Sequence, residues 1–486
     1  MHRAFVSGMF LVSITTALAA PVYQPPGANL TYGDVTHSQQ FQSASGNPAA
    51  AAANRARGDE ARTRGTNLSV AAGLEYGNVQ NLFDFYDNLT RAYEPGDPGT
   101  GGGPGQDPGD KPEGGIDLGD IWDSLDPDFQ DTIASVAAEV ARQAVLLAFV
   151  KNEGYGKAWM GADAPFLLGS EQFGGAWTLG ASWSGMSKAY GIFQTIEFDR
   201  DAARAALEDW FNQLPINRPV QLPLTEQILL TIDPVTDVVR FAIQNDSSIV
   251  SKASQTTEFN VGFSRHAWSN SEGSLFLGVE ARLYFMRLSR LSVRFGEITD
   301  SEELFDVIRH SHFSNDTRLG VDIGALWVGE NYQIGAQLTN VNQPKFTFPD
   351  VDLDPYSDTT IIGLIQRDQI YTMDRQLKLE VSLFTSDRRW STYLGLDADP
   401  ATDPMGDDYQ WLTLSVGLAR DSWWLPGVRI GFRQNLAGTE MKYVGIGLTA
   451  FKIVNFDISS ALHTVSIDGK TFPQGLMLSI GFQITW

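Results

Sequence analysis

The side chains that could do chemistry in this sequence are few and poorly spaced for it. The chain has six His and no Cys, which excludes disulfides, thiolate metal sites and thiol redox chemistry. His310 and His312 could place two imidazoles on one side of an extended stretch, but no carboxylate follows at a metal-ligand spacing. Ser459 and His463 share one face of an alternating segment but are too far apart to act as nucleophile and base. The sequence also lacks G-x-S-x-G, P-loop and H-E-x-x-H motifs, so we expect no enzyme and no catalytic, cofactor or metal site.

The charge balance is strongly acidic. The 486 residues include 58 Asp and Glu against 35 Lys and Arg, a formal net charge of −23. Nucleic acids are bound by neutralising their phosphates with basic side chains, and no basic patch is visible along the chain. We therefore expect no direct nucleic-acid binding.

The N-terminus has the pattern of an export signal. A basic start at Met1-His2-Arg3 precedes an apolar stretch, Ala4 to Thr16, and a small-x-small cleavage site at Ala17-Leu18-Ala19. Residues 1–19 are therefore interpreted as a cleaved signal peptide. The longest later candidate for a membrane helix, residues 132–150, contains an acidic and a basic residue and is typical of an amphipathic helix.

Apolar and polar residues alternate along fourteen segments with the two-residue period of a strand. In the last segment, six apolar residues from Leu476 to Trp486 alternate with smaller or more polar residues. The predicted strands are residues 66–77, 176–183, 187–197, 256–268, 274–287, 316–328, 331–341, 373–385, 389–397, 409–420, 427–436, 440–451, 453–464 and 474–486.

The lengths of the connections separate a membrane barrel from a soluble sandwich, which alternation alone would also allow. If the N-terminus is periplasmic, every long connection follows an odd-numbered strand, and even-numbered strands are followed by turns such as Gly329-Glu330 and Lys452. Short turns on one side and long loops on the other are typical of transmembrane barrels, in which only a closed sheet pairs all backbone groups in lipid. The sequence thus predicts an all-β fold, a transmembrane antiparallel β-barrel of about 14 strands spanning residues 65–486.

This fold places the chain in the outer membrane of a Gram-negative bacterium, in contact with outer-membrane lipid. Trp486 resembles the C-terminal signal that the barrel insertion machinery reads. Aromatic residues near strand ends are expected at the membrane interface. They are Trp327, Tyr332, Tyr371, Trp390, Trp411, Trp423, Trp424 and Trp486.

The polar phase of the strands is expected to line a wet lumen that holds Gly, Ser and charged residues instead of an apolar pocket. The charged residues on this phase are Glu280, Arg282, Asp322, Lys378, Glu380, Arg429, Arg433 and Asp457.

The long connections hold other elements. Residues 94–120 are rich in Gly and Pro and are predicted to be a flexible loop. Residues 126–150 begin with Asp-Pro, an N-cap and first-turn signal, and are predicted to be a helical insertion. Further helices are predicted from Arg200 to Asn212 and from Glu302 to His310. Such helices could cap the pore or form a docking surface for a partner.

The segment before the first strand, residues 20–64, carries a short motif. It contains Leu30-Thr31-Tyr32-Gly33 and, further on, Ser45-Gly46 followed by Asn47-Pro48-Ala49. The Asn47-Pro48-Ala49 motif resembles the segment that closes the N-terminal plug of FadL-type fourteen-strand barrels. The long insertion after the first strand is similar to that of TraF-like conjugal-transfer outer-membrane proteins of the same superfamily. The resemblance implies an N-terminal plug, although residues 37–41 replace the Met-Gly-Gly stretch that often precedes the motif.

Three functions follow from these patterns. The resemblance implies a conjugal-transfer component, associated with type IV secretion, that acts through contacts with conjugation or secretion machinery proteins. A FadL-like channel for the uptake of hydrophobic small molecules is the second. A structural or adhesive outer-membrane barrel is the third.

Overall fold

The computed structural model describes the barrel and its inner segments. The described residues are 29–32, 46–56, 64–77, 154–168, 174–194, 220–225, 228–233, 238–243, 245–294, 297, 311–367, 369–420, 423–467 and 470–485. The signal peptide, the loop at 94–120, the three helices expected at 126–150, 200–212 and 302–310, and Trp486 lie outside them.

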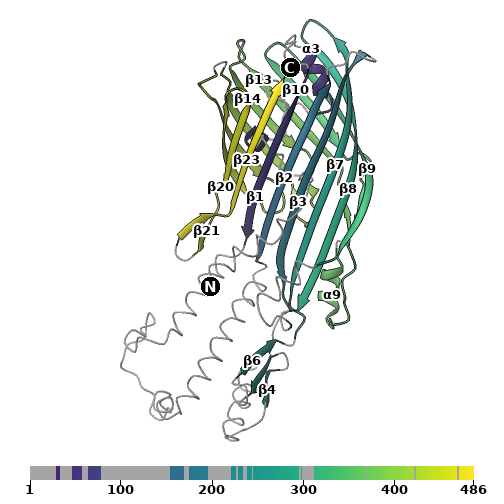
Figure 1. The fold of residues 1–486 in the computed structure, drawn as a ribbon, viewed down its shortest axis with the longest axis vertical. Helices are drawn as coiled ribbons and strands as arrows, with labels where there is room; N and C mark the ends of the chain where they lie inside the picture. Colours follow the sequence, from purple (N-terminus) through teal and green to yellow (C-terminus); the bar gives the residue numbers. More distant parts are fainter. Residues whose placement is uncertain are drawn as a thin grey trace, which may run out of the picture.

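Fourteen antiparallel strands form a closed barrel (Figure 1). The first strand pairs with the last, from Gly65 opposite Thr485 to Glu75 opposite Gly475, so the sheet has no free edge. The barrel strands, in chain order and in ring order, are β1 (Gly65–Gly77), β2 (Tyr155–Leu168), β3 (Ala176–Ile192), β7 (Ser248–Ser269), β8 (Ser274–Arg294), β9 (Phe313–Val328), β10 (Tyr332–Thr339), β13 (Gln376–Phe384), β14 (Trp390–Asp397), β17 (Trp411–Leu418), β18 (Gly427–Asn435), β19 (Lys442–Ala450), β20 (Val454–Ala461) and β23 (Gly475–Thr485). The predicted fold class is confirmed.

Two of the predicted strands were wrong in detail. Strand β2 was missed, and the segments predicted at 176–183 and 187–197 belong to the single strand β3. Alternation is weak in β2 because its outward positions are largely Gly and Ala, while Trp159 and Leu167 point inward and are buried. The omission and the division cancel, so the side on which each later connection lies is unchanged.

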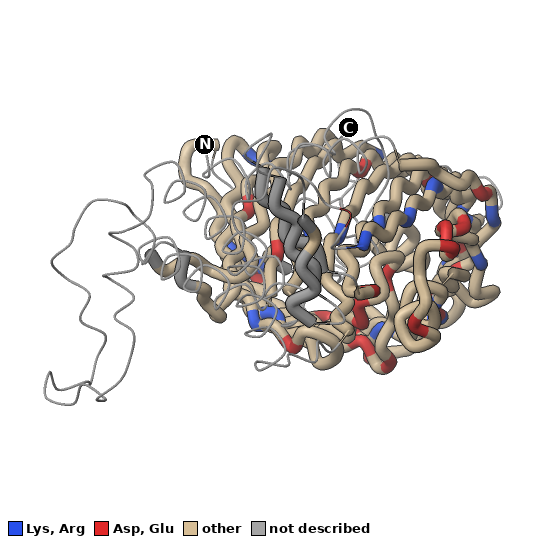
Figure 2. Tube along the Cα trace, turned by 90° about the horizontal axis from the view of Figure 1, so that it is seen from below, with Lys and Arg blue, Asp and Glu red and all other residues tan. Residues whose placement is uncertain are grey.

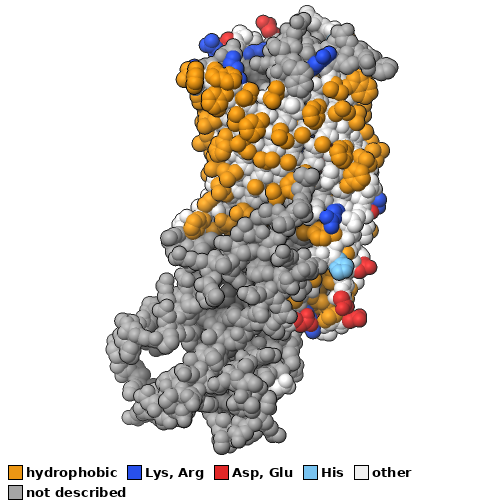
Figure 3. All heavy atoms as spheres, in the orientation of Figure 1, with side chains coloured by type: hydrophobic (Ala, Val, Ile, Leu, Met, Phe, Trp, Pro, Cys, Tyr) orange, Lys and Arg blue, Asp and Glu red, His pale blue; other side chains and the backbone are white. Residues whose placement is uncertain are grey.

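The burial pattern of the strands is the reverse of that in a soluble protein. In β18, Arg429 is 1% exposed and Ile430 is 57% exposed. The same phase continues through the neighbouring strands, and the outward apolar side chains form a broad band with charged residues at its ends (Figure 3). An outward apolar band around a polar interior is the arrangement of transmembrane barrels.

The elements of the long connections that Figure 1 labels lie at the end of the barrel opposite the C-terminus. The described parts of the long connections include a three-stranded sheet, three two-stranded sheets and a helix. These elements are β4 (Val220–Thr225), β5 (Ile228–Asp233) and β6 (Val238–Ile243), then β11 (Lys345–Thr347) with β12 (Ile370–Thr372), α9 (Thr359–Gln366), β15 (Ala401–Thr402) with β16 (Asp408–Tyr409), and β21 (Thr464–Ile467) with β22 (Lys470–Pro473). The sequence did not predict α9, whose Asp358 caps its N-terminus.

Two short helices of the N-terminal segment lie against the inner wall. Helix α2 (Asn29–Tyr32) contacts β17, β18, β19, β20 and β23, and α3 (Ala50–Ala56) contacts β3, β7, β8 and β9. Figure 1 places α3 near the end of the barrel that holds the C-terminus. Among the described helices, none is long and apolar enough to span a membrane.

Candidate functional site: the filled lumen

Among the described residues, several pieces of the chain pack against the inner face of the barrel. Three of them are α2, the segment from Asn47 through α3, and the connection between β14 and β17, residues 398–410. Part of the 340–375 connection packs there as well, with Phe346 and Phe348 against Tyr284 and Met286 of β8. Both signs of charge are interspersed around the barrel when it is viewed along another direction (Figure 2). The contacts of each piece show what holds it.

Helix α2 is attached through a buried ion pair. The Nη2 atom of Arg429 lies 2.7 Å from Oδ2 of Asp457, and both side chains are almost fully buried. The other carboxylate oxygen accepts a hydrogen bond from the hydroxyl of Thr31 in α2. Arg429 also donates to the backbone oxygen of Leu448 over 3.2 Å and to the side chain of Asn455 over 3.3 Å. The guanidinium and the carboxylate are thus both hydrogen-bonded, as a buried pair requires.

The wall strands leave room for this helix at a glycine. A Cβ atom added at Gly431 of β18 would overlap the backbone oxygen of Thr31. Leu30, beside it, is 1% exposed and packs among buried side chains of the wall. The fit and the ion pair together fix α2 in the middle of the β17 to β20 wall.

The Asn47-Pro48-Ala49 segment rests on two facing glycines. Gly278 of β8 and Gly324 of β9 are direct cross-strand partners. A Cβ at Gly278 would overlap the backbone oxygen of Pro48, and one at Gly324 would overlap Oδ1 of Asn47. The motif therefore lies as close to the wall as backbone can approach backbone.

The start of α3 is organised by the same asparagine. Oδ1 of Asn47 accepts from the backbone N–H of Ala49 over 3.0 Å, and its backbone oxygen accepts from Ala50 over 2.9 Å. The backbone N–H of Ala52 donates to Oγ of Ser264 on β7 over 3.0 Å. The described alanines of this run, 49 to 53, are all buried, so small side chains let the helix pack directly on the wall.

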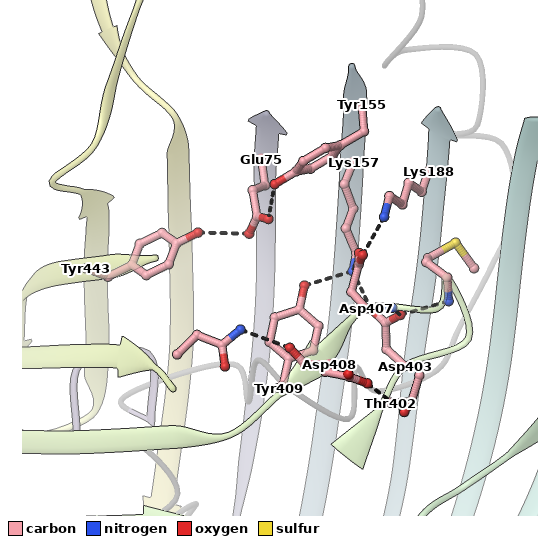
Figure 4. Close-up of polar contacts among 12 residues, drawn as sticks. Glu75, Tyr155, Lys157, Lys188, Thr402, Asp403, Asp407, Asp408, Tyr409 and Tyr443 are labelled. Carbon is pink, nitrogen blue, oxygen red and sulfur yellow. Dashed lines mark hydrogen bonds and ion pairs between the residues drawn. The ribbon is translucent and has the colours of Figure 1, made fainter. Parts of the chain in front are cut away.

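The 398–410 connection crosses the lumen. Strand β14 is ninth in the ring and β2 is second, so the two lie on opposite sides of the fourteen-strand barrel. Yet Nζ of Lys157 on β2 forms ion pairs with Asp403 and with Asp407, the latter at 2.8 Å, and donates to the hydroxyl of Tyr409 at 2.8 Å (Figure 4). Lys188 on β3 pairs with Asp407 as well. The connection is therefore tied to the opposite wall.

The two carboxyls of this connection have different electrostatic environments. Burial disfavours the charge on Asp407, but Lys157 and Lys188 more than offset it, so the pKa of Asp407 is held well below its usual range. Burial dominates at Asp403, whose pKa is raised although Lys157 lowers it in part. Oδ1 of Asp403 also accepts the backbone N–H groups of Met405 and Asp407, over 2.8 and 3.0 Å, which shapes the turn.

A second polar group lies beside these lysines. Glu75 of β1 is buried and accepts hydrogen bonds from the hydroxyls of Tyr155 and Tyr443, each over 2.9 Å (Figure 4). Because Glu75 is the direct cross-strand partner of Lys157, the carboxylate also balances part of the positive charge on this wall.

A third cluster lies on the wall formed by β7, β8 and β9. Arg282 contacts Glu258 at 2.7 Å, Glu280 at 2.6 Å and Asp322 at 2.8 Å. The backbone N–H of Asn340 donates to the other oxygen of Asp322 over 2.8 Å. One guanidinium therefore serves three carboxylates, an arrangement that stiffens the wall and leaves it acidic.

The charged residues that the sequence placed in the lumen fall into three groups. Glu280, Arg282 and Asp322 meet in the cluster above, and Arg429 pairs with Asp457. The remaining three are Lys378, Glu380 and Arg433. Glu380 is buried on β13 opposite Gly335, Lys378 is half-buried on the same strand, and the guanidinium of Arg433 stacks 4.6 Å from the ring centre of Trp411.

The lumenal lysines and their acidic partners were missed by sequence reasoning. Lys157 lies on the strand that was not predicted, and Asp403 and Asp407 lie in the connection that follows the predicted strand 389–397. The available signal was that Lys157, Trp159 and Gly161 occupy alternate positions of β2. This pattern indicates an inward face only once the neighbouring strand is known.

Three histidines lie among the described residues, and His310 of the candidate pair His310 and His312 lies outside them. His312 and His463 are exposed, and Nε2 of His266 lies 2.7 Å from Oγ of Ser269. Ser459 donates to the backbone oxygen of Val444 over 3.5 Å. In the part of the chain that the structure describes, no group of three or more His, Asp and Glu side chains could hold a metal ion.

Two aromatic residues expected at the membrane interface are instead inside the barrel. Trp411 and Tyr371 are 7% and 6% exposed. Trp411 belongs to a cluster with Trp159, Tyr409 and Tyr443, which also contains buried methionines. The lumen is therefore more apolar than its strand sequences indicated, because the inward loop brings Met405 and Tyr409 into it.

These observations define a transmembrane-type β-barrel whose inner wall is covered by α2, by the segment from Asn47 through α3 and by folded-in connections. A family model described as "F plasmid transfer operon, TraF, protein" matches residues 44–399, most of the chain, and the chain belongs to this family. The resemblance to TraF-like conjugal-transfer outer-membrane proteins is thereby confirmed. Among curated proteins, no sequence matches this chain.

Two solved structures are similar to this chain in fold. The "TodX deltaS2S3 mutant monoaromatic hydrocarbon channel" is 8% identical with a TM-score of 0.43, over 96% of this chain and 100% of that chain. A Pseudomonas aeruginosa FadL homologue is 13% identical with a TM-score of 0.36, over 96% and 99% of the two chains.

Proposed function

We propose that this protein is an outer-membrane component of a conjugal-transfer machinery, associated with type IV secretion, that acts through protein contacts. Membership of the TraF family supports the transfer role. The predicted signal peptide, the outward apolar band and the predicted insertion signal at Trp486 support export and insertion into the outer membrane of a Gram-negative bacterium by the barrel insertion machinery.

The observation that carries the mode of action is the filling of the lumen. Three separate pieces of the chain are anchored there by buried contacts, through Asp457, through the Gly278 and Gly324 pair, and through Lys157. The 398–410 connection reaches the opposite wall. A barrel that keeps its interior occupied in this way presents surfaces and loops to partners, and these are what we expect the machinery to bind.

A mating assay tests the transfer role. The gene is deleted in the strain that encodes it, and transfer of a marked conjugative element to a recipient is counted. We expect the transfer frequency to fall by at least about tenfold, which is more than the several-fold change in protein abundance that modest destabilisation produces. The frequency should return when the gene is supplied in trans. Normal transfer in a deletion strain whose outer membrane is otherwise intact contradicts it.

Direct DNA binding is not part of this proposal. The basic side chains Arg282 and Arg429 are paired with buried acids. Filter binding of the purified protein at low salt should show no tight, salt-sensitive capture of DNA.

A channel for hydrophobic small molecules is the second candidate. The buried cluster around Trp159 and Trp411, with Met186, Met441 and Met477, supplies soft apolar surface inside the barrel. Growth on a long-chain hydrophobic substrate that depends on this gene, with normal mating, favours the channel. If both assays are unaffected by deletion, a structural or adhesive barrel remains.

A further inference from the structure

Four basic side chains form a row across the inner wall. Lys157 on β2 is the register partner of Lys188 on β3, Lys188 is the partner of Lys252 on β7, and Lys252 is the partner of Arg290 on β8. Neighbouring strands are about 4.8 Å apart, so the row extends about 14 Å around the wall. All four side chains point away from the lipid, and Lys157, Lys252 and Arg290 are buried.

Two inward connections cover this row. Asp403 and Asp407 of the 398–410 connection lie on Lys157 and Lys188. Phe348 and the end of α9, from the 340–375 connection, lie on the other half. Lys252 is 5.5 Å and Arg290 5.9 Å from the ring centre of Phe348, and Arg290 donates to the backbone oxygen of Arg367 over 3.0 Å.

The half under the 398–410 connection has the form of an anion site with an internal occupant. Each oxygen of Asp407 reaches a different ammonium, Oδ2 to Lys157 and Oδ1 to Lys188. Asp403 adds a second carboxylate on Lys157. Two carboxylates held four residues apart on one turn therefore present the same groups as a short dicarboxylate.

We propose that Lys157 and Lys188 form a binding site for dicarboxylate anions. In this structure the side chains of Asp403 and Asp407 occupy the site. A dianion that replaces the two carboxylates leaves the net charge of the site unchanged. Each lysine keeps a carboxylate partner, so the cost of a buried charge without its counter-charge does not arise. Lys252 and Arg290 continue the row of basic side chains on the same wall. The site is independent of the transfer role, because it rests on contacts inside the barrel.

Anion rescue of a variant tests the site. Asp407→Asn removes the carboxylate that bridges both lysines but keeps its size. The purified full-length variant in detergent is unfolded thermally with succinate, acetate, inorganic phosphate or chloride at equal ionic strength. Succinate should raise the unfolding midpoint saturably, with apparent binding at least about tenfold tighter than in the wild type, whose site is occupied.

Two further variants decide the outcome. Asp387→Asn, in an exposed turn between β13 and β14, is the matched control and should behave as the wild type. Asp407→Asn combined with Lys188→Met should lose the rescue. No succinate effect on Asp407→Asn, an equal effect of acetate, an effect confined to phosphate, or rescue that survives the loss of Lys188 overturns the proposal. If Asp407→Asn does not fold, refolding yield with and without succinate gives the same decision.

Discussion

Arg429 and Asp457 join the barrel wall to the N-terminal plug. Their side chains meet at 2.7 Å with exposures of 2% and 0%, and the same carboxylate accepts the hydroxyl of Thr31 from α2. The ion pair is thus shared between two strands and a segment more than 400 residues away in the sequence. A plug attached to a buried charge pair cannot leave without exposing that pair.

The first prediction concerns this pair. Asp457→Asn leaves Arg429 buried without its counter-charge, and breaking a buried pair in this way costs about 3–5 kcal/mol. We expect the free energy of unfolding, measured by denaturant titration in detergent micelles, to fall by about this amount. Asp387→Asn, in an exposed turn, should leave it unchanged. A variant at position 457 as stable as the wild type would contradict the role assigned to the pair.

The second prediction concerns the glycine pair under the Asn47-Pro48-Ala49 motif. In Gly324→Ala the added methyl overlaps Asn47 and lies 2.9 Å from Cδ of Pro48, so the plug must shift. Overpacking of this kind costs about 1–3 kcal/mol. Exchange of the backbone amides of α3 should therefore become roughly 5- to 150-fold faster.

The control for this prediction is a glycine that has room. Gly445→Ala places its methyl no closer than 3.5 Å to any neighbour, an ordinary contact. Exchange in α3 should be unchanged there. Equal acceleration in both variants would mean that the barrel loosens generally and that the motif has no special fit on the wall.

The third prediction tests which face of β18 meets lipid. Ile430 points outward from the middle of the strand, beside Val416 and Ile446. Ile430→Arg should cost about 2–4 kcal/mol of folding free energy in a bilayer, and the same change near an interface about 0–1. Folding into phosphatidylcholine vesicles, followed by gel mobility without boiling, measures it. Leu425→Arg, in the turn before β18, is the matched control; equal costs would contradict the assigned lipid face.

The barrel itself could be predicted from the sequence because successive residues of a membrane strand alternate between the lipid and the lumen. From β7 onward each strand has a clear apolar phase, and the connections that follow β7, β9, β13, β17 and β19 are short turns. β2 escaped because Ala158, Ala162 and Ala164 make a weakly apolar outer face while Trp159 lies inside. A search for alternation detects a difference in hydrophobicity between the two faces of a strand. In β2 this difference is small, because the large apolar side chain of Trp159 is on the inner face.

The site could be predicted only in part, because it is made by contacts between distant strands. The inward phase of Arg429 and Asp457 is visible in the sequence, but their pairing depends on a register that spans β18 to β20. The ion pairs of Lys157 require a loop to cross the barrel. Loop length showed that 398–410 was a connection, and nothing local shows that it folds inward.

The last prediction concerns the pH dependence of α9. Oδ1 of Asp358 accepts the backbone N–H groups of Thr360 over 2.7 Å and Ile361 over 3.2 Å, and these bonds lower the pKa of Asp358. Because its folded pKa lies below the unfolded value of about 3.9, the carboxylate stabilises the helix above that pH. This stabilisation is lost as the pH falls through the folded pKa.

Amide exchange across α9, corrected for the intrinsic pH dependence of exchange, measures this effect. Protection of Thr360 and Ile361 should be constant above about pH 5 and should fall progressively below about pH 4. Asp358→Asn keeps an oxygen that can cap the helix but does not titrate, so its protection should be flat over the same range. Asp358→Ala should be poorly protected at every pH. If the wild type and the Asn variant lose protection together, the acid sensitivity of this helix comes from a group other than its N-cap.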